Sequence, residues 1–351
     1  MVDWFAYNNS PLKRHNIPFR STILNMWNTK MKNINKNNLD RYSLCTNHSI
    51  TIATPIVSTR GHFCLHTGKL NSVHNLGDYN YSYVPGLGGY PSSDNKELAI
   101  YIHGVWTGQA SAKEQIDRTK LSLNANGYNI PVVGFSWDSN TATNPLGWNI
   151  AKIIANQNGP KLANFISDFK ANSPNCNMRI IAHSLGAKIV ESTLITLYNN
   201  NQKWKKSSVY NITSIHLIGA DISDKAPSKN QPFGIAIENI VNHFYNLYNP
   251  EDNALKRAYV KTEDQNPLGL FGLKKGEPSP ANYSERNVMF EIPPFTKASR
   301  IYQTFCDKAV YGWGDNHCGY IGFRESYPFN KVLKDDGAIN VIVEDWSTNN
   351  R

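Results

Sequence analysis

The sequence lacks any run of the roughly 18 to 20 apolar residues that a membrane-spanning helix requires. Its N-terminus also lacks the charged-then-apolar order of a secretory signal, so we expect a cytoplasmic protein. Cysteine is scarce as well, because the 351 residues include only five. A set that is odd and sparse argues against a disulfide framework. A bridge between Cys306 and Cys318 is conceivable, but free buried thiols are the preferred interpretation.

Acidic residues are few at the start of the chain. Residues 1–48 hold seven Lys or Arg against two Asp, a surplus of +5 out of +9 for the whole chain. Such a basic segment is typical of proteins that contact an anionic membrane surface or a phosphate backbone. No binding motif accompanies the charge, which favours a solvated Lys/Asn-rich surface. Nucleic-acid binding is therefore not expected, and an anionic membrane stays as the candidate partner.

After residue 95 the pattern alternates between short apolar strands and helices. Strands are expected at 98–103, 131–137, 178–182, 214–219 and 241–247, and helices at 112–124, 148–170 (with a break at Gly159-Pro160) and 185–198. Nearly continuous apolar strands that alternate with helices are typical of a mostly parallel sheet covered on both faces. The predicted fold class is therefore α/β.

Two stretches fit this alternation poorly. Residues 1–95 are expected to form an N-terminal extension of irregular and β segments, ahead of a main domain at 96–351. Residues 258–300 are rich in Gly, Pro and aromatic side chains. They are expected to form a lid or an insertion over a site, with a plain surface excursion as the alternative.

The segment Arg-Ile-Ile-Ala-His-Ser-Leu-Gly-Ala at 179–187 carries the strongest chemical signal. A strand leads into Ser184 and a helix leaves from Leu185. Larger side chains two residues before or after the serine would collide with the crossing strand and helix. Ala182 and Gly186 occupy those two positions, which matches a nucleophile elbow. Ser184 is therefore the predicted nucleophile.

A serine hydroxyl needs a neighbouring base that is itself oriented by an acid. In enzymes with such an elbow, the acid and then the histidine follow the serine along the chain. His216 and His243 fall inside expected strands, where an imidazole is more often packed than free. His317 lies in a polar, glycine-flanked loop, and this favours it as the base.

Two carboxylates follow the ends of expected strands and are candidates for the acid. Asp221 comes directly after one strand, and Asp252 comes shortly after the next. Asp252 is alternatively a helix N-cap before Leu255. Glu251 and Asp315 remain as further alternatives.

Acyl transfer also needs N–H donors that stabilise a developing oxyanion. The amide of Leu185 is one candidate, because it lies at a helix N-terminus, where the dipole favours negative charge. The amide of Val105 is the second, in the loop after the first strand of the main domain. Gly104 lets this loop turn closely, and His103 is expected to support the loop.

These motifs together resemble the α/β-hydrolase superfamily over residues 96–325. The resemblance is to a poorly characterised esterase/lipase-like branch that shares the His103-Gly104 loop, the Gly-Phe-Ser-Trp segment at 134–137, the elbow from His183 to Gly186, the segment 249–255 and His317. It implies that the acid follows the later strand, which favours Asp252. It also implies a Ser–His–Asp hydrolase without metal or organic cofactor.

The expected function is hydrolysis of a carboxylic ester through an acyl-enzyme, with a small-molecule ester or a lipid as substrate. One alternative is a lipase or phospholipase whose basic residues 1–48 meet an anionic membrane surface. Another is a non-catalytic binding module on a hydrolase scaffold, because fold does not fix function.

Overall fold

The computed structural model describes residues 54–71, 77–84, 95–199, 210, 212–259, 263, 265–292, 302–303, 316–322, 324–325 and 337–348. The chain divides into two units, 1–51 and 52–351, and every described residue belongs to the second. The basic segment 1–48, for which a membrane partner was considered, lies outside the described residues.

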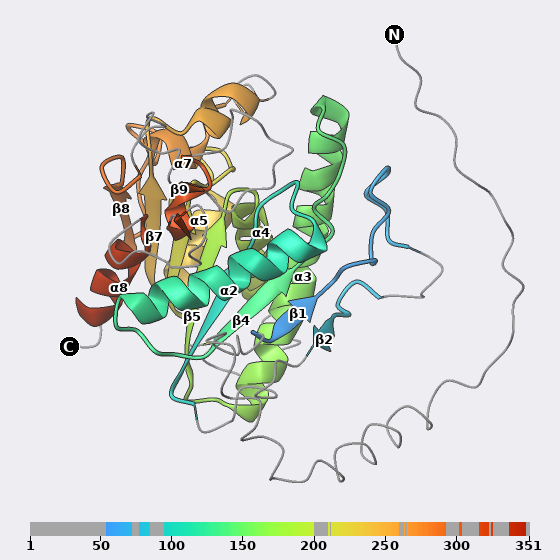
Figure 1. Ribbon diagram of the computed structural model, residues 1–351, viewed down its shortest axis with the longest axis horizontal. Helices are drawn as coiled ribbons and strands as arrows, with labels where there is room; N and C mark the ends of the chain where they lie inside the picture. The colour runs from blue at the N-terminus through green and yellow to red at the C-terminus, as the bar shows by residue number, and fades with distance from the viewer. Residues whose placement is uncertain are drawn as a thin grey trace, which may run out of the picture. The chain divides into compact units, whose positions relative to one another are not determined.

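A single large sheet organises the described part of the chain (Figure 1). Its eight strands run in the spatial order β2-β1-β4-β3-β5-β6-β7-β8. Every neighbouring pair is parallel except β1 with β2. The strands are β1 Ile56–Ser58, β2 Ser82–Val84, β3 Glu97–Ile102, β4 Val132–Ser136, β5 Asn177–His183, β6 Ile212–Ile218, β7 Val241–Tyr248 and β8 Tyr283–Asn287.

Helices cover both faces of this sheet. Alternate side chains of β3 belong to two separate apolar cores, because successive strand residues point to opposite faces. Leu98 and Ile100 pack on the side of α3 (Pro145–Asn172), α4 (Gly186–Asn199) and α5 (Pro232–Ile240). Ala99 and Tyr101 pack on the side of α2 (Gln109–Ala125) and α8 (Ile339–Thr348). The predicted α/β fold with a mostly parallel, doubly covered sheet is confirmed.

Helix α3 runs without interruption through Pro160, so the predicted break at Gly159-Pro160 is wrong. Proline has no N–H and leaves the carbonyl four residues earlier, that of Asn156, without its helical donor. The Ser192 hydroxyl on α4 donates to this carbonyl at 2.6 Å instead. Gly159 allows the close approach, because a Cβ there would lie 2.2 Å from Ser192 Oγ. The neighbouring helix therefore replaces the bond that the proline removes.

Parts of the two irregular stretches are built into the sheet. Strands β1 and β2 come from the predicted N-terminal extension and form one edge of the sheet. At the other edge, β8 lies within residues 258–300 and pairs with β7. The short helix α7 (Leu268–Phe271) buries Leu268 and Leu270 against the main core.

Smaller elements complete the described chain. The π-helix η3 spans Leu255–Tyr259, and the 3-10 helix η5 spans Gly319–Ile321. Strands β9 (Tyr302–Gln303) and β10 (Arg324–Glu325) form a separate antiparallel pair.

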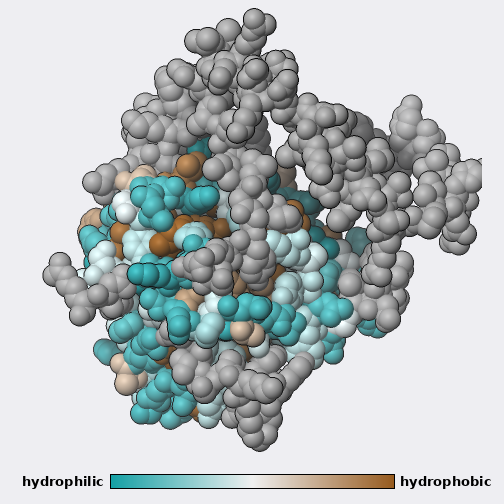
Figure 2. All heavy atoms as spheres, turned by 90° about the horizontal axis from the view of Figure 1, so that it is seen from below, coloured by the Kyte–Doolittle hydropathy of each residue, from teal (hydrophilic) through white to brown (hydrophobic). Residues whose placement is uncertain are grey.

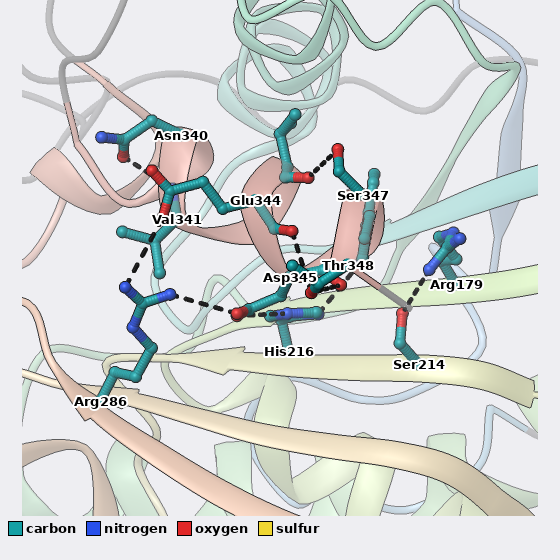
Figure 3. A network of polar contacts seen from close by, with 12 residues as sticks. Arg179, Ser214, His216, Arg286, Asn340, Val341, Glu344, Asp345, Ser347 and Thr348 are labelled. Atoms are coloured by element: carbon teal, nitrogen blue, oxygen red, sulfur yellow. Dashed lines mark hydrogen bonds and ion pairs between the residues drawn. The ribbon is translucent and has the colours of Figure 1, made fainter. Parts of the chain in front are cut away.

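A network of polar contacts fastens α8 to the sheet (Figure 3). His216 Nε2 lies 3.3 Å from Asp345 Oδ2, and Trp346 Nε1 donates to His216 Nδ1 at 3.3 Å. Arg286 forms an ion pair of 3.1 Å with Asp345. Burial lowers the pKa of His216, although Asp345 opposes the shift. His216 is thus a packed strand residue, as its position in the sequence indicates.

No helix among the described residues is both long and apolar enough to cross a membrane. On the face seen in Figure 2, hydrophilic residues predominate among those that are coloured, and hydrophobic ones form small groups. Cys64 and Cys176 are free thiols. Cys318 is disulfide-bonded, so the preference for free thiols is wrong at this position. The conceivable partner Cys306 lies outside the described residues.

Candidate active site

Ser184 occupies a strained turn between β5 and α4. Its φ angle is +56°, in the left-handed region that residues other than glycine rarely adopt. Small neighbours make the turn compatible with the packing around it. A Cβ at Gly104 would lie 2.8 Å from Ser184 Cβ, and one at Gly186 would lie 3.0 Å from the carbonyl oxygen of His103. The backbone therefore has the geometry of a nucleophile elbow.

Backbone bonds tie Ser184 to the end of the neighbouring strand β6. Its amide donates to the carbonyl of Ile218 at 3.0 Å, and its carbonyl accepts from the amide of Asp221 at 3.2 Å. Since β5 and β6 are parallel, these bonds fix the serine at the carboxyl edge of the sheet.

His317 and Asp252 form a close pair. His317 Nδ1 lies 2.7 Å from Asp252 Oδ2, and since a carboxylate only accepts, Nδ1–H is the donor. Burial alone would lower the pKa of His317, but the charge and hydrogen bond of Asp252 more than offset it, and the net shift is upward. This arrangement leaves Nε2 as the nitrogen that is available as a base.

Asp252 is fully buried and has three donors around its carboxylate. Besides His317, the Leu255 amide donates to Oδ1 at 3.0 Å and the Tyr320 hydroxyl to Oδ2 at 3.3 Å. The two interpretations of Asp252 from the sequence, partner of the histidine and cap of the following helix, are thus compatible. Oδ2 contacts the histidine, and Oδ1 caps the helix.

The other acid candidates are placed differently. Glu251 is exposed and forms a surface ion pair of 3.0 Å with Lys256. Asp221 is buried near the serine, but the His317 ring bonds to Asp252 instead. Asp315 lies outside the described residues.

Gly219 brings the serine and the histidine to the same place. It follows Ile218, whose carbonyl holds the Ser184 amide. A Cβ at Gly219 would lie 3.3 Å from Cε1 of His317. His183, directly before the serine, has its Nε2 2.7 Å from the carbonyl of His317. The three predicted residues therefore gather at one edge of the sheet, although they are widely separated in the sequence.

His183 is held in its neutral form. Burial, with the nearby His317 adding to the effect, lowers the pKa of His183 to about 3. A neutral ring whose Nε2 carries the proton donates to the His317 carbonyl. His183 is thus a positioning residue for the loop that carries His317.

The loop after β3 lies against the serine, because a Cβ at Gly104 would be 2.8 Å from Ser184 Cβ. Within the described part of the chain, the amides of Val105 and Leu185 donate to no other residue. His103 braces this loop, because its Nε2 accepts from the Trp137 amide at 3.2 Å and its carbonyl accepts from Trp137 Nε1 at 2.9 Å. The two rings also stack at 5.7 Å. Both candidate oxyanion donors are therefore unoccupied and near the elbow.

Sequence reasoning missed Arg60, which completes the support of the loop. Its guanidinium bonds to His103 Nε2 at 3.1 Å, to the Thr107 carbonyl at 2.9 Å and to Ser136 Oγ at 2.9 Å. No sequence signal reveals these contacts, because Arg60 lies more than 40 residues before its partners. Tyr320 was also missed, although it follows His317 by only three positions.

A pocket of about 730 Å³ opens beside the serine turn. Leu185 and Asp221 line it next to the elbow, and residues of α3 also line it. Among the described residues, no group of three or more His, Cys, Asp or Glu side chains is arranged to hold a metal ion.

Comparison with known proteins places this chain among hydrolases. Residues 90–293 match the model of a family described as alpha/beta hydrolases of unknown function (DUF900). An uncharacterized protein of Nostoc sp., alr1448, is 27% identical over 216 residues, which cover 54% of this chain and 54% of that protein. The chain thus spans about half the length of this curated relative.

Solved structures resemble the chain only distantly. The lin2722 product of Listeria innocua has a TM-score of 0.33 at 13% identity, over 55% of this chain and 84% of that one. Lipase B of Aspergillus fumigatus has a TM-score of 0.30 at 12% identity, over 56% of this chain and 45% of the lipase. Scores this low carry no information on function. The family match, which spans more than half of the chain, does identify the family: the chain belongs to the alpha/beta hydrolases of unknown function.

Proposed function

We propose that this alpha/beta hydrolase is a serine esterase that cleaves carboxylic esters through an acyl-enzyme. The observation that carries the proposal is the 2.7 Å contact between His317 Nδ1 and Asp252 Oδ2 beside a serine with a φ of +56°. A serine in a turn of this shape is not by itself a sign of catalysis, because such turns are common. An elbow serine beside a buried, carboxylate-oriented imidazole is the arrangement that nucleophilic catalysis needs.

In the first half of the proposed reaction, Ser184 Oγ attacks the carbonyl carbon of the ester and its proton passes to His317 Nε2. The amides of Val105 and Leu185 donate to the oxyanion that develops. The bond between the carbonyl carbon and the alcohol oxygen then breaks, and His317 returns the proton to the departing alcohol. The acyl group stays on Ser184.

In the second half, water attacks the acyl-enzyme. His317 takes a proton from the water and gives it to Ser184 Oγ as the acyl bond breaks, which releases the carboxylic acid. Asp252 holds the ring in the tautomer with its proton on Nδ1 and stabilises the imidazolium that forms in each half. The raised pKa of His317 is the ground-state sign of the same stabilisation.

The proposal is tested with 4-nitrophenyl acetate in a stopped-flow instrument. An acyl-enzyme mechanism predicts a burst of 4-nitrophenol that approaches one equivalent of enzyme whenever deacylation is slower than acylation. Ser184→Ala is expected to lose at least about 10³-fold in kcat/KM. Ser347→Ala, at an exposed serine on α8, is the matched control and is expected to keep the wild-type rate. Equal activity of Ser184→Ala and wild type would contradict the proposal.

A further inference from the structure

The loop from His103 to Thr107 contains a strained residue directly after the candidate oxyanion donor. Trp106 has a φ of +52°, in the left-handed region, where a bulky side chain is rarely found. Such a conformation persists only where the surrounding contacts hold it in place. The direction of the Val105 amide, one residue earlier, therefore depends on those contacts.

A single nitrogen of Arg60 connects the two ends of this loop. Its Nη2 donates to His103 Nε2 at 3.1 Å and to the carbonyl of Thr107 at 2.9 Å. Its Nε donates to Ser136 Oγ at 2.9 Å, at the end of β4. Because a guanidinium is planar and rigid, bonds from one such group to three partners hold both ends of the loop against the end of β4.

The same contacts determine where His103 carries its proton. The Arg60 guanidinium and the Trp137 amide can only donate, so His103 Nε2 accepts from both and has no proton. The proton then lies on Nδ1, which donates to the carbonyl of Gly104 at 2.8 Å. Burial, with the charge of Arg60 adding to the effect, lowers the pKa of His103 well below its ordinary value, so the ring stays neutral.

The bond to the Gly104 carbonyl sets the direction of the Val105 N–H. Both groups belong to one peptide unit, which is planar and trans, so the N–H points opposite to the carbonyl. Since the carbonyl accepts from the His103 ring, the Val105 N–H points away from that ring. A Cβ at Gly104 would lie 3.3 Å from Ser184 Oγ, so this peptide unit lies beside the proposed nucleophile.

From the strain at Trp106, the bonds of Arg60 to both ends of the loop and the fixed peptide unit before Val105, we propose that Arg60 is a positioning residue for transition-state stabilisation. It holds the Val105 amide in the direction in which it donates to the oxyanion. The inference rests on the proposed esterase function. Arg60 follows β1 (Figure 1) and lies ahead of the family match at 90–293, so a segment outside that match contributes to the active site.

The test replaces Arg60 with methionine, which is a long, flexible side chain without a donor. Only the transition state carries the oxyanion, so kcat and kcat/KM for 4-nitrophenyl acetate are expected to fall equally, with KM within about twofold of wild type. The expected fall is about 10- to 100-fold, part of the roughly 10²- to 10³-fold loss that removal of an oxyanion donor causes. Arg286→Met, which loses an ion pair with Asp345, is the matched control and should keep the wild-type values.

A trifluoromethyl ketone, 2,2,2-trifluoroacetophenone, measures the oxyanion site without a leaving group. Ser184 Oγ bonds to its carbonyl carbon, the serine proton passes to His317 Nε2, and the carbonyl oxygen becomes an oxyanion that needs the same donors. Its inhibition constant should rise in Arg60→Met by the factor by which kcat/KM falls. A merely structural loss would lower the amount of active enzyme and leave the inhibition constant unchanged.

Ser136→Ala is a milder second variant, because it removes one acceptor of Arg60 and leaves the guanidinium in place. It should lower kcat by about threefold or more at unchanged KM. If Arg60→Met does not fold, this variant decides the question, and a wild-type kcat in it would overturn the inference.

Different failures point to different errors. A folded Arg60→Met with wild-type kcat, a change confined to KM, or an equal loss in Arg286→Met would overturn the inference and leave the esterase proposal standing. Failure of the folded wild-type protein to hydrolyse any ester, together with no burst from 4-nitrophenyl acetate, would overturn the proposed function and this inference with it.

Discussion

Replacement of Asp252 separates its two structural contacts. In Asp252→Asn, the amide oxygen can still accept from the Leu255 amide, which donates to Oδ1 at 3.0 Å. The amide nitrogen then faces His317 Nδ1, where the carboxylate oxygen lies at 2.7 Å. Two N–H donors cannot bond to each other, so His317 is expected to move its proton to Nε2 and lose its function as a base.

The expected loss of kcat in Asp252→Asn is roughly 10⁴-fold, the cost that the wrong histidine tautomer has in a serine triad. Stability should change little, since the cap remains. Asp252→Ala loses the cap as well and leaves the buried Tyr320 hydroxyl without any partner at this position, whereas in Asp252→Asn the hydroxyl can accept from the amide nitrogen. It should therefore be less stable than Asp252→Asn by roughly 2 to 4 kcal/mol.

The assay measures ester hydrolysis against pH and urea unfolding for both variants. Because Asp252 raises the pKa of His317 and the base must be neutral, the acidic limb of any residual activity should move to lower pH in Asp252→Asn. Activity of Asp252→Asn within about tenfold of wild type would refute the assigned role. Equal stability of the two variants would refute the cap.

Three further predictions follow from the packing. Ser192→Ala removes the donor to the Asn156 carbonyl and should lower the free energy of unfolding in urea by about 1 to 3 kcal/mol. The control Ser347→Ala should lower it by less than about 0.5 kcal/mol. Equal effects would argue that the Ser192 hydroxyl does not replace the bond that Pro160 removes. Gly104→Ala would bring a Cβ to 2.8 Å from Ser184 Cβ and displace the serine or the loop. It should reduce kcat/KM by about 10²-fold or more and leave the circular dichroism spectrum unchanged. Wild-type activity would show that the loop can move to accept the methyl group without loss of function. Stability should fall as pH decreases from 8 to 6, because the buried His103, His183 and His216 have lowered pKa values and unfolding lets them bind protons as the pH approaches 6.5 and falls below it. The raised pKa values of His317 and Asp221 oppose this trend, but the three histidines are expected to outweigh them. A rise in the free energy of unfolding over that range would contradict the assignment.

The sequence indicates the elbow because its requirements are local. Ala182 and Gly186 stand two positions from Ser184, and the strand and helix around it have strong patterns of their own. His317 and Asp252 depend on chain order and on strand ends, which the apolar runs also reveal. Their roles as base and orienting acid stay predictions, although the structure brings the two side chains to 2.7 Å.

What the sequence does not reveal depends on contacts across long separations. Pro160 predicts a break, and only the packing of α4 supplies the Ser192 hydroxyl that replaces the missing donor. Strand β8 is mostly exposed and carries Tyr-Ser-Glu-Arg-Asn, so it has no apolar run that would mark a strand. Arg60 lies in the predicted N-terminal extension, and nothing near it in the chain indicates that it bonds to His103.

The central claim is that Ser184 is an activated nucleophile, and labelling by a fluorophosphonate probe tests it most directly. We expect intact-mass and peptide analysis to find one probe molecule on Ser184 in the wild-type protein, much slower labelling in His317→Ala, and none at this site in Ser184→Ala. A folded wild-type protein that stays unlabelled, or one labelled at another serine while Ser184 stays free, would contradict the account.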